Sequence, residues 1–104
     1  MKKDSRVKAV ISLDAVEHNF REMRKNIAED TKMIAVIKAD AYGHGAVPVA
    51  HLIEDYDYIW GFAVATAEEA IHLREAGVTK PILILGIVFD EFYPELVRYD
   101  IRPA

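Results

Sequence analysis

Cysteine is absent from this chain of 104 residues, and tryptophan occurs only once. Without cysteine the chain has neither a disulfide framework nor a thiolate metal site, which is typical of a reducing compartment. No apolar run reaches the length of a membrane span, and the charged start, Met1-Lys2-Lys3-Asp4, leads into no apolar region typical of a signal peptide. We therefore expect a cytoplasmic protein with no membrane segment in this chain.

Positive charge is also scarce. Lysine and arginine total 13 against 17 acidic residues, giving a net charge of −4. Without a basic stripe to neutralise phosphates, we expect no binding to nucleic acid. Of the four histidines, those at positions 18, 51 and 72 lie too far apart for a metal-binding signature, so we expect no metal site. The apolar fraction of 52% is ample for the core of one small domain.

Apolar strands and amphipathic helices alternate along the chain. Strands are predicted at residues 33–37, 58–64 and 81–85, with another beginning at 101. Helices are predicted at 13–29 after an N-cap at Ser12, at 46–55, at 67–76 after a Thr66–Glu69 capping box, and at 90–98 after a cap at Asp90. This alternation predicts an α/β fold with a parallel sheet, either doubly wound or part of a (β/α)8 barrel. A complete barrel needs roughly 250 residues, so a barrel chain of this length would be a fragment truncated near its fourth strand.

The most distinctive stretch runs from Met33 to Gly45 and reads M-I-A-V-I-K-A-D-A-Y-G-H-G. Its first five residues are a continuous apolar run, which predicts a strand buried on both faces. Lys38 follows at the end of that strand, where barrels place catalytic groups and where an amine can serve Schiff-base chemistry. A strand-end lysine that simply reaches water is the alternative. The pattern alone leaves both open.

The run A-V-I-K-A-D-A-Y-G-H-G resembles the signature of the alanine racemase family, the fold-type III enzymes that use pyridoxal 5′-phosphate (PLP). Residues 11–20 are similar to the opening segment of that family, and residues 81–86 to its third barrel strand. The resemblance implies the N-terminal portion of a (β/α)8 TIM-type barrel. Residues 1–11 would contain a short strand that joins a C-terminal β-domain. Residues 12–104 would form a partial PLP-binding barrel of about three to four βα units.

The same resemblance implies roles for three residues. Lys38 would carry PLP as an internal aldimine and transfer a proton on one face of the substrate Cα. Tyr42 would contact the cofactor phosphate, although a tyrosine that packs the helix–strand corner is the alternative. Leu85 would lie against the cofactor ring, and a plain core leucine is as compatible with the sequence. The family takes its second base, a tyrosine, from the C-terminal domain of the partner subunit, so we expect the isolated fragment to be inactive.

Two further residues of the motif carry weaker predictions. Asp40 could hold a backbone amide or a basic side chain, or it could be an exposed carboxylate in the turn. His44 is more typical of a structural histidine, and we assign it no proton transfer.

The implied function is that of an isomerase, an alanine racemase that interconverts L- and D-alanine. It would act on a small amino-acid substrate as a cytoplasmic homodimer. Its role would be D-alanine biosynthesis, which provides a precursor of peptidoglycan. The alternatives are a serine racemase domain of the same family, a non-catalytic PLP-binding barrel, and an open-sheet interaction domain. The sequence A-D-A-Y-G-H-G after Lys38 argues against the PLP-binding barrel, because the PLP-homeostasis relatives follow their lysine with a different sequence.

Overall fold

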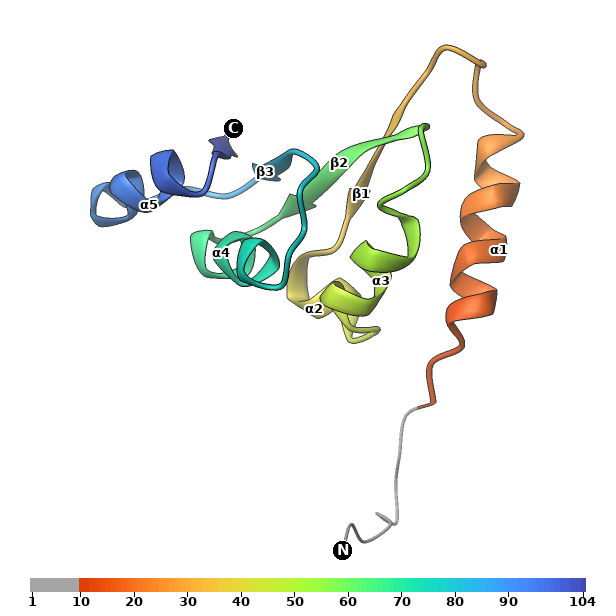
Figure 1. Cartoon of the computed structure of the whole chain (residues 1–104), viewed down its shortest axis with the longest axis horizontal. Coiled ribbons are helices and arrows are strands. Elements are labelled where there is room, and N and C mark those ends of the chain that lie inside the picture. Colours follow the sequence, from red (N-terminus) through yellow and green to blue (C-terminus); the bar gives the residue numbers. More distant parts are fainter. Residues whose placement is uncertain (1–9) are drawn as a thin grey trace, which may run out of the picture.

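A computed structural model describes residues 10–104 (Figure 1). Four parallel strands form one sheet in the order in which they occur along the chain. The strands are β1 (Met33–Val36), β2 (Ile59–Val64), β3 (Ile82–Ile84) and β4 (Ile101–Pro103). The helices are α1 (Leu13–Arg24), α2 (Lys38–Tyr42), α3 (Ala46–Ile53), α4 (Ala67–Glu75) and α5 (Tyr93–Arg98), with a 3₁₀ turn at Asp90–Phe92.

The strand order separates the two architectures that the sequence left open. Each strand pairs in parallel with the strand before it, with Phe62 opposite Ile82 and Ile82 opposite Ile101. A doubly wound sheet reverses its strand order at a switch point, and no reversal occurs between β1 and β4. A (β/α)8 barrel keeps sequential order. The expected barrel-type α/β fold is therefore confirmed.

The core lies on one face of this sheet, against α3 and α4, which run along the same side of the strands in Figure 1. Phe62, Ile82 and Ile84 of the sheet are completely buried. The helices contribute Ile53 and Leu73, which are also buried. Burying each such side chain stabilises the fold by about 1.5–3 kcal/mol, so this face holds the unit together.

The opposite face of the sheet is open at its β1 edge. Val36, Ala63 and Leu83 stand side by side on neighbouring strands, since each is the register partner of the next. In β1, Ile34 is 45% and Val36 is 41% exposed. The prediction that β1 is buried on both faces is therefore wrong for residues 10–104, because helices cover only one side. The open face is the one that a closed barrel turns inward.

Two helix boundaries differ from the prediction. α1 ends at Arg24 rather than near residue 29, because the Asn26 side chain donates to the carbonyl of Glu22 and competes with the helical ladder. Asp90 does not cap a helix through its side chain. A 3₁₀ turn comes first because Pro94 has no N–H to bond the Asp90 carbonyl and continue an α-helix from there. The strand predicted within residues 1–11 lies mostly outside the described residues, and residues 10 and 11 form no strand.

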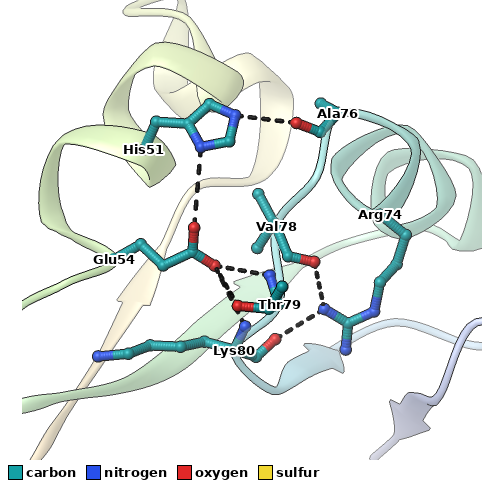
Figure 2. Close-up of polar contacts among 7 residues, drawn as sticks. All are labelled: His51, Glu54, Arg74, Ala76, Val78, Thr79 and Lys80. Carbon is teal, nitrogen blue, oxygen red and sulfur yellow. Dashed lines mark hydrogen bonds and ion pairs between the residues drawn. The ribbon is translucent and has the colours of Figure 1, made fainter.

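A hydrogen-bonded network ties the amino ends of the strands together (Figure 2). Glu54 Oε2 accepts the backbone N–H groups of Thr79 and Lys80, at 2.6 and 3.2 Å. The Arg74 guanidinium donates to the carbonyls of Val78 and Lys80, at 2.9 and 2.8 Å. The Lys80 amine in turn donates to two carbonyls, those of Tyr56 and Ile59. In a barrel the residues at the amino ends of the strands usually serve stability. Catalytic groups are therefore expected at the carboxyl ends.

Candidate active site

All three residues predicted for the site lie at the carboxyl edge of the sheet. Ile37 continues β1 by donating its N–H to the carbonyl of Ala63 at 2.9 Å, and Lys38 comes next, half-buried. Leu85 directly follows β3, with its N–H bonded to the carbonyl of Val64 and 48% of its surface exposed. Neighbouring strands are about 4.8 Å apart, so the ends of β1 and β3, which Lys38 and Leu85 follow, lie about 10 Å apart on either side of β2.

The turn after Lys38 is left-handed, which the sequence did not predict. Ala39, Asp40, Ala41 and Tyr42 have φ angles of 51–56°. The left-handed helical region costs an L-residue about 1–2 kcal/mol. Four such residues in succession persist only where the surroundings determine their conformation, and strain of this kind gathers at functional sites.

Several hydrogen bonds hold this turn in place. The Ala41 N–H donates to the carbonyl of Ile37 at 2.9 Å, and the Gly45 N–H to the carbonyl of Asp40 at 2.8 Å. The Asp40 side chain accepts the N–H of Ala46 at 2.8 Å and so caps α3. The turn ends at Gly43, whose φ of 87° suits glycine. Of the three roles considered for Asp40, the structure confirms the binding of a backbone amide, and Asp40 is also an exposed residue of the turn.

Glu69 makes a contact in this region that the sequence did not predict. It was expected only as a partner in the capping box of α4, and that box is present. Its second carboxylate oxygen also accepts the N–H of Ala39, the residue after Lys38, at 2.6 Å. The two residues are 30 positions apart, so no local pattern signals the contact.

Tyr42 and His44 differ in their surroundings. Tyr42 lies in the left-handed turn and is 61% exposed. The ring of His44 lies 3.0 Å from the carbonyl of Ala41 through Nδ1, which must carry the hydrogen because a carbonyl only accepts. This bond within the turn supports the structural reading of His44.

The side chains at this edge fit the cofactor that the resemblance implies. Lys38 offers an amine for the aldehyde of PLP, Tyr42 a hydroxyl donor for its phosphate, and Leu85 an exposed apolar surface for its ring. The backbone after Leu85 is close-packed, since a Cβ at Gly86 would lie 2.6 Å from the carbonyl oxygen of Ala65. No hydrogen bond or ion pair joins the Lys38 amine to the side chains or backbone of residues 10–104.

Within residues 10–104, no three His, Asp or Glu side chains are grouped as a metal site would require. No helix in this range is long and apolar enough to cross a membrane.

Comparisons with known proteins agree with this geometry. Residues 11–104 match the family model described as alanine racemase, N-terminal domain. An alanine racemase of Streptococcus pneumoniae is 51% identical over 93 residues, covering 89% of this chain and 25% of that protein. Alanine racemase 1 of Caldanaerobacter subterraneus is 47% identical over 93 residues, covering 88% of this chain and 23% of that protein.

Solved structures give the same result. The alanine racemase of Clostridium difficile 630 superimposes with a TM-score of 0.86 at 43% identity, over 89% of this chain and 24% of that one. The alanine racemase of Bacillus anthracis, solved with bound L-Ala-P, gives a TM-score of 0.83 at 35% identity, over 90% and 24% of the two chains. The chain thus spans about a quarter of the length of these relatives. It belongs to the alanine racemase family and corresponds to the N-terminal part of the barrel of those enzymes.

Proposed function

We propose that this chain is the part of a PLP-dependent racemase that carries the cofactor lysine, and that the full-length protein interconverts L- and D-alanine. The observation that carries the proposal is a half-buried lysine at the carboxyl end of β1, followed by a strained turn that bears Tyr42, in a chain of this family. Two facts support alanine as the substrate: the relatives named above are alanine racemases, and one of them was solved with bound L-Ala-P.

In this proposal Lys38 has two tasks. Its amine would hold the cofactor, and once the substrate amine has taken its place, the freed Lys38 amine would move a proton at the substrate Cα on one face. The Tyr42 hydroxyl would donate a hydrogen bond to the phosphate, and Leu85 would cover the ring and keep water from it. PLP, when bound, supplies the electron sink that makes the Cα proton labile. The second base and the remaining cofactor contacts are expected outside this chain, in a cytoplasmic homodimer.

Trapping of the cofactor tests the proposal. PLP is added to the full-length protein, the mixture is reduced with borohydride, and modified peptides are mapped by mass spectrometry. A single adduct at Lys38, absent from Lys38→Ala, is expected. Scattered adducts, or none, would remove Lys38 from the mechanism.

Racemisation itself is the companion measurement. The full-length protein is expected to convert L-alanine to D-alanine, and Lys38→Ala to reduce the rate to background. The isolated 104 residues are expected to show little or no turnover, because the second base is missing. Substantial turnover by the isolated chain would contradict that expectation.

A further inference from the structure

The carboxylate of Glu69 lies between two neighbouring strand ends, and only one of its oxygens serves its own helix. Oε1 accepts the N–H groups of Ala65 and Thr66, at 2.9 and 3.1 Å. The Thr66 hydroxyl accepts the N–H of Glu69 at 3.2 Å, which completes the capping box of α4. Oε2 is not needed for this cap.

Oε2 accepts the N–H of Ala39 at 2.6 Å. Ala39 directly follows Lys38 and is the first of the four left-handed residues. Hydrogen bonds to a carboxylate are shorter and stronger than neutral ones. Glu69 therefore fixes the peptide unit at which the chain leaves β1 and turns left-handed.

One other bond spans Lys38, from the Ala41 N–H to the Ile37 carbonyl, and the remaining bonds of the turn lie further along it. The Asp40 carbonyl and side chain accept from Gly45 and Ala46, and the Ala39 carbonyl accepts from Gly43. None of these bonds engages the Ala39 N–H. A pocket of about 280 Å³ lies close by, and its lining includes Ile37, Asp40 and Glu69 itself.

We infer that Glu69 is a positioning residue for Lys38: through the Ala39 N–H, its carboxylate sets the direction in which Lys38 leaves the strand and hence the place of the Lys38 amine. The inference rests on the proposed function, in which that amine holds PLP. Glu69 itself touches neither cofactor nor substrate in this scheme.

The test follows the rate at which Lys38 takes up PLP. Full-length protein freed of cofactor is mixed with PLP, samples are reduced with borohydride at intervals, and the Lys38 adduct is quantified by mass spectrometry. Glu69→Gln brings an amide NH₂ group against backbone N–H donors, so it should slow the reaction by at least about tenfold, within the roughly 100-fold that an ångström of misplacement can cost. Glu68→Gln, in the same turn of α4 and exposed, is the matched control and should react at the wild-type rate.

Thr66→Ala separates positioning from helix capping. It removes the cap hydroxyl but leaves the Glu69 carboxylate beside Ala39. It should lower the Tm much as Glu69→Gln does, yet leave the Lys38 rate near that of the wild type. Equal slowing in Thr66→Ala and Glu69→Gln, or an unchanged rate in Glu69→Gln, would overturn the inference.

A second readout needs no cofactor. In protein carrying isotope-labelled alanine, the amide proton of Ala39 should resonate downfield because of its short bond to a carboxylate. Glu69→Gln should abolish that shift and Thr66→Ala should keep it.

If the wild type forms no adduct at Lys38, the proposed function fails, and the Ala39 signal alone decides the role of Glu69. An unchanged Ala39 signal in Glu69→Gln then overturns the inference. If Glu69→Gln does not fold, Glu69→Asp, one methylene shorter, should show a smaller effect in the same direction in both readouts.

Discussion

Glu54 is the residue on which the network at the amino ends of the strands depends (Figure 2). Burial by itself raises the pKa of Glu54. The hydrogen bonds from the N–H groups of Thr79 and Lys80 and from the Thr79 hydroxyl, with His51 nearby, outweigh burial and hold the pKa below the ordinary value of 4.5. A carboxyl whose pKa is lowered by folding stabilises the fold above its unfolded-state pKa, and this contribution is lost as the pH falls through the folded-state pKa.

Glu54→Gln is therefore expected to lower the free energy of unfolding at neutral pH, and the deficit should shrink between about pH 5 and about pH 3. Urea unfolding of both proteins across that range is the measurement. Asp55→Asn, an exposed neighbour, should change stability by no more than about 0.5 kcal/mol at any pH. A deficit for Glu54→Gln that stays constant or grows toward acid pH would contradict this account.

At Gly61, β2 and the chain entering β3 lie close together. A Cβ at this position would lie 2.3 Å from the carbonyl oxygen of Pro81. Replacing a strand glycine by alanine ordinarily stabilises by about 0.5–1 kcal/mol. Here we expect Gly61→Ala to destabilise instead, by about 1–3 kcal/mol, because two backbone segments must separate. Denaturant unfolding of both proteins shows whether the substitution lowers or raises the free energy of unfolding.

At the scale of elements, the start of α3 depends on the turn before it. Its N-cap residue, Gly45, has no side chain, and Asp40 accepts the Ala46 N–H in its place. Asp40→Ala should therefore cost about 0.5–2 kcal/mol of stability. Asp40→Asn keeps an acceptor oxygen and tolerates the left-handed backbone, so its Tm should stay near that of the wild type. Equal losses of Tm in the two variants would show that the cap is unimportant.

Elements whose determinants are local could be predicted from the sequence. Ser12 caps α1 by accepting the N–H of Ala15, and Thr66 and Glu69 form their capping box, because each pair is three residues apart. The carboxyl-end position of Lys38 was also predictable, since a continuous apolar run ends there. The roles of Lys38, Tyr42 and Leu85 stay predictions.

Features that depend on distant partners could not be predicted. The bond between Glu69 and Ala39 joins residues 30 positions apart. The left-handed turn contains alanine and tyrosine, which have no preference for that conformation and adopt it only because tertiary contacts require it. The one-sided burial of β1 has the same origin: an apolar run shows that its residues can be buried, but not that both faces are covered within this length of chain.

For the whole molecule, the open face of the sheet predicts how the 104 residues behave alone. Ile34 and Val36 are exposed there, and within residues 10–104 the outer strands β1 and β4 each pair on one side only. Exposed apolar surface beside unpaired strand edges favours association. We expect the isolated chain to self-associate and to bind an apolar dye, as measured by light scattering and fluorescence.

Paired substitutions identify the surface responsible for this association. Ile34→Thr with Val36→Thr should reduce both signals. Val10→Thr, an exposed position before α1, should leave both signals unchanged. A monomeric wild-type chain that binds no dye would contradict the expectation.

The sequential strand order also has a consequence for synthesis on the ribosome. Because each strand pairs with the one made just before it, the sheet can grow as the chain emerges, without waiting for a distant segment. The helical side of each new unit is covered as soon as its helix forms, whereas the other side stays uncovered until a barrel closes. Nascent chains should therefore offer chaperones a surface that contains Ile34 and Val36, for as long as translation of the remaining barrel takes.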